Sequence, residues 1–150
     1  LPLWPSEEKA REILRLAISQ ADVVKMSDEE ITFVSGEDDL EEGIKDLWCD
    51  QWRAMIVTYG PKGSRYTTPA FDGFVPSFEI TAVDATGAGD GCTAGFLSRL
   101  LKDPELLGSE DKLAKACRFA NAVGAITATK RGAINALPTE KEVEDFLSNR

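Results

Sequence analysis

The chain has 150 residues, of which 43% are hydrophobic and 29% charged, values typical of one folded domain rather than of a disordered chain. Its formal charge of −9 argues against a nucleic-acid surface, which needs a basic stripe, and against contact with an anionic membrane. The absence of histidine excludes Ser-His-Asp triads, HExxH zinc sites and histidine general bases.

The first 80 residues are predicted to alternate helices with short apolar strands. Ser27 is a good N-cap, and Glu30 three residues later completes a capping box. The segment 60–63, Gly-Pro-Lys-Gly, breaks the regular structure that precedes it. The expected elements are a helix from Ser6 to about Gln20, a strand Asp22–Met26, a helix opened by Ser27, a helix near Leu40–Asp50, a strand Ala54–Thr58 and two antiparallel strands, Ser64–Pro69 and Phe74–Ile80.

The second part of the chain opens with the run Ala82–Asp90, which predicts a strand, a tight glycine loop and a helix start. The helix is expected over Cys92–Lys102, with Ala94, Leu97 and Leu101 on its packed side. The remaining expected elements are a helix Leu113–Thr129 and a helix opened by Thr139, with Glu142 as its capping partner. Helices that alternate with apolar strands predict an α/β fold with a layered, partly parallel sheet.

Three widely spaced cysteines, Cys49, Cys92 and Cys117, form no CxxC pair and predict buried, reduced thiols in a reducing compartment. No apolar run approaches the ~20 residues of a membrane span, and no signal peptide is visible. Because the first residue is leucine, we expect the chain to be a piece of a longer protein. The default localisation is cytoplasmic, with a plastid as the alternative.

The glycine loop is the most informative feature of the chain. Backbone N–H groups at Gly87, Ala88 and Gly89 would be unpaired at a helix N-terminus and would point at an anion placed there. Asp90 puts a carboxylate beside this phosphate cradle, an arrangement suited to phosphoryl transfer to an alcohol. The alternatives are an acidic residue that only complements the helix dipole and a helix-start turn that merely needs glycine.

Five segments follow one another in a recognisable order: Leu1–Ser6, Lys25–Glu30, Thr58–Gly63, Asp84–Asp90 and the tail from Phe119–Ala125 through Arg131–Ala133. In this order they resemble the pfkB (ribokinase-like) family of carbohydrate kinases and, within it, the fructokinases. The resemblance covers nearly the whole chain and implies a ribokinase-like three-layer α/β/α sandwich. Residues 1–150 would be the C-terminal, ATP-binding half, without the N-terminal sugar-binding half and lid. We expect little kinase activity from these residues alone.

The resemblance also implies roles for individual residues. Asp90 would be the catalytic base that takes the proton of the sugar hydroxyl as it attacks the γ-phosphoryl group of ATP, with Gly87, Ala88 and Gly89 as the anion hole. Thr58, Gly60, Pro61, Lys62 and Gly63 match the nucleotide loop T-x-G-x-x-G, and Asn121 and Gly124 match positions that line the adenine pocket. An ordinary turn and helix packing through small residues are the respective alternatives.

Two cation sites follow from the same resemblance. Ser27 and Glu30 stand where many relatives have N-x-x-E, whose glutamate helps to hold Mg²⁺ through water, and a purely structural capping box is the alternative. A monovalent, K⁺-like site is matched by Asp84 and Thr86 with the backbone of Thr127, Lys130 and Gly132. Ala136 stands where relatives can offer a hydroxyl, which weakens this second match.

The opening segment Leu1–Ser6 favours a fructokinase, which converts D-fructose and ATP to D-fructose 6-phosphate. Ribokinase and 2-keto-3-deoxygluconate kinase are alternatives within the family. A non-catalytic, fructokinase-like interaction subunit is the alternative of another class, against which the intact glycine loop and Asp90 argue. The expected partners are fructose and ATP, with neither nucleic acid nor membrane, and homodimerisation through the family's lid would lie outside this chain.

Overall fold

A computed structural model describes residues 4–150, so the expected segment Leu1–Ser6 lies partly outside the described residues. The helices are α1 (Glu7–Ile18), α2 (Asp28–Ser35), α3 (Leu40–Leu47), α4 (Ala88–Lys102), α5 (Glu110–Ala128) and α6 (Glu140–Ser148). The strands are β1 (Val23–Ser27), β2 (Ala54–Thr58), β3 (Gly63–Thr67) and β4 (Asp72–Pro76). Short 3-10 helices span η1 (Gly60–Lys62), η2 (Pro104–Gly108) and η3 (Ile134–Ala136).

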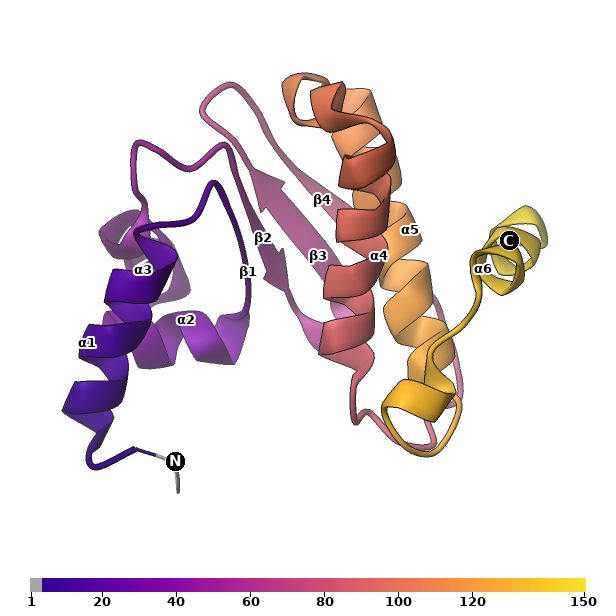
Figure 1. The fold of residues 1–150 in the computed structure, drawn as a ribbon, viewed down its shortest axis with the longest axis horizontal. Helices are drawn as coiled ribbons and strands as arrows, with labels where there is room; N and C mark the ends of the chain where they lie inside the picture. The colour runs from indigo at the N-terminus through magenta and orange to yellow at the C-terminus, as the bar shows by residue number, and fades with distance from the viewer. Residues whose placement is uncertain (1–3) are drawn as a thin grey trace.

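The four strands form one mixed sheet in the order β1-β2-β3-β4. β1 and β2 are parallel, whereas β3 and β4 continue the sheet as an antiparallel hairpin. Helices α1–α3 lie on one side of the sheet, α4 and α5 cover the other face, and α6 lies beyond α5 (Figure 1). The expected three-layer α/β/α arrangement is confirmed.

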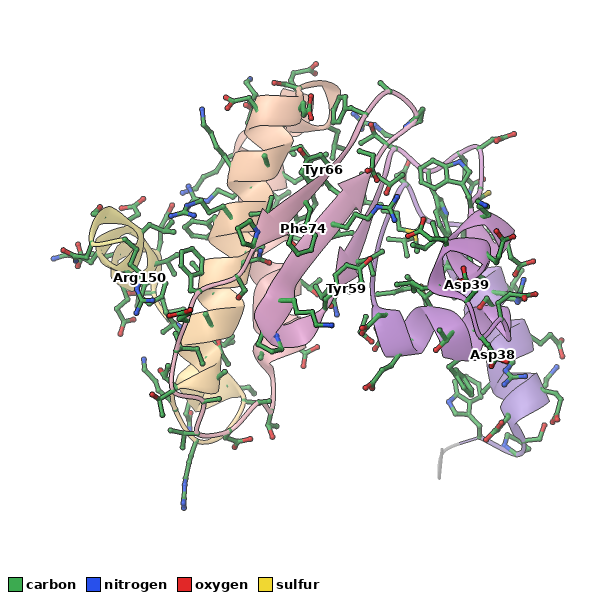
Figure 2. All side chains as sticks on the ribbon, turned by 180° about the vertical axis from the view of Figure 1, so that it is seen from behind. Asp38, Asp39, Tyr59, Tyr66, Phe74 and Arg150 are labelled. Carbon is green, nitrogen blue, oxygen red and sulfur yellow. The ribbon has the colours of Figure 1, made fainter. Side chains whose placement is uncertain are left out.

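Alternation along the strands supplies a core on each face of the sheet. Val24 and Met26 of β1 point toward α2 and α3, where Trp52 is almost fully buried. On the opposite face, Ile56 and Tyr66 pack against α4 and α5. Figure 2 shows the far side of the hairpin, where Tyr59 and Phe74 form a tilted aromatic pair with ring centroids 6.0 Å apart.

Local sequence signals place two helix starts. The Ser27 hydroxyl accepts the Glu30 N–H at 3.1 Å, and the Glu30 carboxylate accepts the Ser27 N–H at 2.7 Å. Thr139 and Glu142 form the same reciprocal box at the start of α6. Each box satisfies backbone N–H groups that the first turn leaves without a partner inside the helix, so both expected capping boxes are confirmed.

Three expectations about the elements of the chain are wrong in detail. Residues 82–84 form no strand, because the N–H groups of Val83 and Asp84 both donate to one carbonyl, that of Ala128, instead of to a neighbouring strand. The expected strands at 64–69 and 74–80 begin one and two residues earlier and end at Thr67 and Pro76.

The expected packed side of α4 is the third error. Ala94, Leu97 and Leu101 are exposed, and the buried side is formed by Gly91, Cys92, Gly95 and Phe96. The two glycines let α4 approach α5 closely, since a Cβ at Gly95 would lie only 2.8 Å from the Val123 side chain. The face of α4 that carries these two glycines is therefore buried against α5.

Cys92 and Cys117 are buried and Cys49 is half-buried, and all three thiols are free. Burial raises the pKa of Cys92 and raises that of Cys117 to about 12, so both thiols stay protonated at neutral pH. No helix within residues 4–150 combines the length and the apolar character needed to cross a membrane.

Candidate active site

The glycine loop turns the chain sharply into α4. Gly87 is the N-cap in the left-handed conformation, with φ of 77°, and the Gly91 N–H donates to its carbonyl at 2.8 Å. A Cβ at Gly87 would lie 2.8 Å from the Cβ of Ala133, so both the backbone angle and the available space require glycine.

The backbone amides at this helix start are not equivalent. Within residues 4–150, the N–H groups of Gly87 and Gly89 have no hydrogen-bond partner, as expected for an anion cradle. The Ala88 N–H instead donates to the Ala85 carbonyl at 3.1 Å. The expectation that all three amides are unpaired is therefore wrong for Ala88, because the tight turn satisfies its amide locally.

Asp90 lies in the first turn of α4 and its side chain is exposed. Within the described residues its carboxylate forms neither a hydrogen bond nor an ion pair with another side chain. An exposed carboxylate next to unpaired amides can receive a proton from a molecule that binds at the helix start. The role of Asp90 as a base stays a prediction.

Asp84 fastens the glycine loop to the segment that follows α5. Its Oδ1 accepts the Thr86 N–H and its Oδ2 accepts the Gly132 N–H, both at 3.0 Å. Hydrogen bonding to the Thr86 side chain, and then to the backbone N–H groups of Gly132 and Thr86, lowers the pKa of Asp84 from 3.8 to about 2. This carboxylate holds together two loops that are 48 residues apart in sequence.

The low pKa of Asp84 is directly measurable. Because its folded pKa is depressed, the carboxylate stabilises the folded protein fully above pH 4 and loses this effect as the pH falls toward about 2. A carboxyl-carbon NMR titration of the full-length protein is expected to give a midpoint near 2. Thr86→Val should raise that midpoint, since it removes the first cause of the shift. An unshifted midpoint near 3.8 in the unsubstituted protein would contradict the clamp.

The residues matched to a monovalent-cation site lie in the glycine loop, at the end of α5 and in the segment that follows α5. Asp84, Thr86 and Gly132 are adjacent through the hydrogen bonds above. The Thr127 hydroxyl is buried and donates to the Val123 carbonyl, and the Lys130 ammonium pairs with Glu142 at 3.5 Å. The match uses only the backbone of Thr127 and Lys130, so these side-chain contacts do not bear on it, and the cation site stays a prediction.

The residues matched to the nucleotide and Mg²⁺ lie at one end of the sheet. Ser27 and Thr58 are register partners at the carboxyl ends of the parallel strands β1 and β2, the usual position of ligand sites in α/β sheets. The η1 turn follows β2 at this end, where α4 also begins (Figure 1). Gly60 and Gly63 both have positive φ, and a Cβ at Gly63 would lie 2.2 Å from the Val75 carbonyl oxygen.

Glu30 is the only acidic side chain matched to Mg²⁺. Its side chain is 59% exposed, and its Oε1 has no hydrogen bond within residues 4–150. One free, hydrated carboxylate oxygen suits Mg²⁺, which keeps several of its waters. No group of three or more acidic, cysteine or histidine side chains that could enclose a metal occurs in the part of the chain that the structure describes.

Asn121 and Gly124, the residues matched to the adenine pocket, have packing roles. The Asn121 amide is buried and donates to the Val75 carbonyl at 3.1 Å, which holds α5 against β4. A Cβ at Gly124 would lie 3.1 Å from the Ala88 carbonyl oxygen, so Gly124 lets α5 pass directly beneath the start of α4. Contact of either residue with adenine stays a prediction.

Comparison with known proteins decides the family. The profile of the pfkB family carbohydrate kinases matches residues 1–140. The chain belongs to this family. It is 45% identical over 148 residues to a probable fructokinase-4 of Arabidopsis thaliana and 46% identical over 146 residues to fructokinase-1 of Zea mays. These matches cover 98% and 97% of the chain but only 45% of each relative, so the chain spans less than half the length of these pfkB kinases.

Solved pfkB structures show the same fold. The fructokinase of Vibrio cholerae O395, bound to fructose, ADP and calcium, superposes with a TM-score of 0.89 at 32% identity, covering 97% of the chain and 47% of that protein. The ATP-bound fructokinase of Xylella fastidiosa superposes with a TM-score of 0.89 at 29% identity, covering 98% and 48%. The ribokinase-like fold of this pfkB chain is therefore confirmed as a partial fold.

Lys25 belongs to the pfkB-like segment Lys25–Glu30, but no role was predicted for it from the sequence, and the structure places it near the glycine loop. Lys25 lies on β1, and a Cβ built on Gly89 would lie 3.4 Å from its ammonium nitrogen. The sequence did contain a sign of this position, because Lys25 is the one charged residue in the otherwise apolar run Val23–Met26. Side chains alternate between the two faces of a strand, and this alternation places Lys25 on the face toward α4.

Proposed function

We propose that the protein to which this chain belongs is an ATP-dependent sugar kinase that converts D-fructose to D-fructose 6-phosphate. Residues 1–150 would form its C-terminal half, which binds ATP and supplies the catalytic base. The similarity to plant and bacterial fructokinases supports fructose over other sugars. The missing half would supply most contacts with the sugar.

The observation that carries this proposal is the exposed Asp90 in the first turn of α4, next to the unpaired amides of Gly87 and Gly89. A purely structural acidic residue would not require a glycine loop clamped by Asp84. A scaffold protein would need neither feature. The arrangement supplies both a proton acceptor and donors for developing negative charge.

In the proposed reaction the sugar hydroxyl oxygen forms a bond to the γ-phosphorus of ATP as the bond from that phosphorus to the β,γ-bridging oxygen breaks. The hydroxyl proton passes to the Asp90 carboxylate, and ADP leaves with the electron pair. A carboxylate is a weak base for an alcohol, so much of its contribution is to orient the hydroxyl. The amides of Gly87 and Gly89 would stabilise the negative charge on the transferring group.

Thr58 and the loop 60–63 would face the nucleotide. Mg²⁺, where bound, neutralises phosphate charge. Glu30 would hold this ion through water, since its free Oε1 and its exposure fit that role. A monovalent cation would be held by backbone oxygens near Thr127, Lys130 and Gly132, while Asp84 keeps the two loops together.

The test is a measurement of phosphorylation by the purified full-length protein, with ATP and with fructose, ribose or 2-keto-3-deoxygluconate as the acceptor. We expect kcat/KM to be highest for fructose. A strong preference for either of the other sugars would replace fructose as the substrate. A complete lack of turnover with all three would favour a non-catalytic scaffold.

A further inference from the structure

Lys25 is a lysine on the α4 side of the sheet whose side chain is mostly covered by protein. Along β1, Val24 and Met26 enter the core formed with α2 and α3, whereas Val23 packs against the core beneath α4 and α5. Lys25 shares the direction of Val23, and its side chain is only 20% exposed. An ammonium group carries three N–H donors, which need acceptors from the protein, from water or from a bound group.

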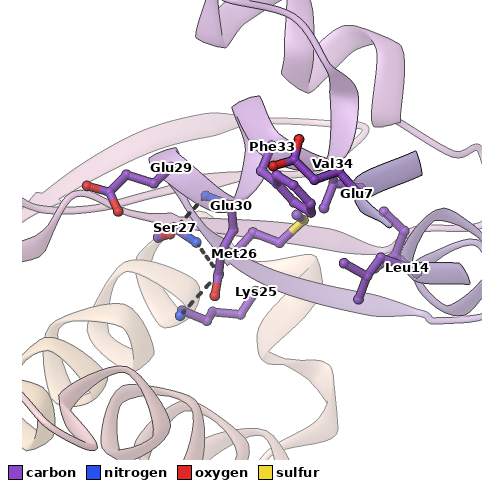
Figure 3. A pocket seen from close by; sticks show the side chains of 10 residues that line it. Glu7, Leu14, Lys25, Met26, Ser27, Glu29, Glu30, Phe33 and Val34 are labelled. Carbon is purple, nitrogen blue, oxygen red and sulfur yellow. Dashed lines mark hydrogen bonds and ion pairs between the residues drawn. The ribbon is translucent and has the colours of Figure 1, made fainter. Parts of the chain in front are cut away.

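The protein alone gives Lys25 few acceptors. Within residues 4–150 its ammonium donates no hydrogen bond, and its only ion pair is with Glu30 Oε2, at the long distance of 4.0 Å. That oxygen already accepts the Ser27 N–H at 2.7 Å. Figure 3 shows Lys25 and Glu30 together, beside a cavity of about 630 Å³ whose apolar lining includes Leu14 and Phe33.

On its other side, the ammonium faces the glycine loop. A Cβ at Gly89 would lie 3.4 Å from Lys25 Nζ, so the absence of a side chain at Gly89 leaves open the space between the ammonium and the helix start. The charge of Lys25 also acts on Cys92 in α4, where it opposes the burial that raises the pKa of this thiol. Lys25 therefore places positive charge next to the helix start that carries the unpaired amides of Gly87 and Gly89.

We propose that Lys25 is a further catalytic residue of this kinase, whose ammonium contacts the transferring phosphoryl group opposite the amides of Gly87 and Gly89. The inference rests on the proposed function. Negative charge in phosphoryl transfer is spread over three equatorial oxygens, and donors on two sides stabilise it better than donors on one. Lys25 would also offset the repulsion between the phosphate and the Asp90 carboxylate. The competing role is a structural one, in which Lys25 only supports Glu30.

The experiment compares Lys25→Met and Lys25→Arg with the unsubstituted full-length protein. Lys25→Met is expected to lower kcat with fructose and ATP by about 10²–10³-fold, the usual effect of losing one electrostatic stabiliser. Lys25→Arg keeps the charge and should recover a large part of this loss. The control is Lys45→Met, which removes an exposed lysine of α3 that pairs with Glu42, and kcat should not change.

Calorimetric binding of ATP and AMP separates a phosphate contact from a structural role. Lys25→Met should weaken ATP binding by about tenfold and leave AMP binding unchanged. An unchanged kcat, or an equal loss of affinity for ATP and AMP, would overturn the assignment. If the unsubstituted protein phosphorylates no sugar, the proposed function fails, while the comparison of ATP with AMP still decides the role of Lys25. If Lys25→Met does not fold, Lys25→Gln is measured by the same criteria.

Discussion

Asp90→Asn in the full-length protein is expected to lower kcat by about 10²–10⁴-fold, the range for loss of a positioned general base. Asparagine has nearly the same shape but cannot take up the proton of the sugar hydroxyl. The Asp90 side chain is exposed and forms no hydrogen bond or ion pair within residues 4–150, so its replacement should not disturb the fold. Steady-state kinetics with fructose and ATP measure the effect.

Binding of ATP should survive this substitution. Asp90 would contact the sugar hydroxyl rather than the nucleotide, and removing a carboxylate reduces its repulsion of the phosphates. The affinity for ATP, measured by calorimetry, is therefore expected to be unchanged or slightly higher. A joint loss of ATP affinity and turnover would indicate that Asp90 organises the nucleotide site instead of acting as a base.

The matched control is Asp111→Asn. Asp111 also lies in the first turn of a long helix, α5, and is exposed, but it pairs with Lys115 on the same helix. Its replacement removes the same helix-dipole interaction, worth about 0.3–1 kcal/mol, without touching the glycine loop. Normal turnover in Asp111→Asn together with normal turnover in Asp90→Asn would show that both residues only complement their helices.

The elements that sequence predicted best are those fixed by neighbours in the chain. Ser27 and Thr139 define helix starts because their capping partners lie three residues away. Residues 82–84 resisted prediction because the amides of Val83 and Asp84 bond to Ala128, about 45 residues farther along the chain. An extended segment that pairs with a helix end has the same local pattern as a strand.

In the candidate site, too, features fixed by sequence neighbours were predicted and features fixed by distant segments were not. The glycine loop and Asp90 form one contiguous motif, so their arrangement at a helix start could be predicted, and the structure confirms it. The importance of Lys25 depends on β1 facing the start of α4, a relation between segments more than 60 residues apart. The use of the Ala88 amide by Ala85 depends on the exact geometry of the turn, which residue types alone do not determine.

Gly87→Ala is expected to reduce both the stability and the activity of the full-length protein. The left-handed φ of 77° costs a residue with a Cβ about 1–2 kcal/mol. The overlap with Ala133 adds about 1–3 kcal/mol, unless the loop shifts to relieve it. Such a shift moves an amide of the proposed anion hole, so kcat should fall by about 10²–10³-fold. Chemical denaturation and steady-state kinetics measure the two effects.

Gly36→Ala is the control for Gly87→Ala, because it introduces the same backbone strain at a position outside the glycine loop. Gly36 ends α2 with φ of 80°, nearly the angle of Gly87, and the nearest atom to an added Cβ is an arginine nitrogen at 3.8 Å. This variant should lose only the about 1–2 kcal/mol that the angle costs, with kcat unchanged. If Gly87→Ala loses stability to the same extent and retains its kcat, Gly87 serves only to turn the chain. The strain of the backbone angle is common to both variants, whereas only Gly87→Ala also clashes with Ala133. If Gly87→Ala loses more stability than Gly36→Ala and also loses turnover, the clash with Ala133 displaces the loop amides.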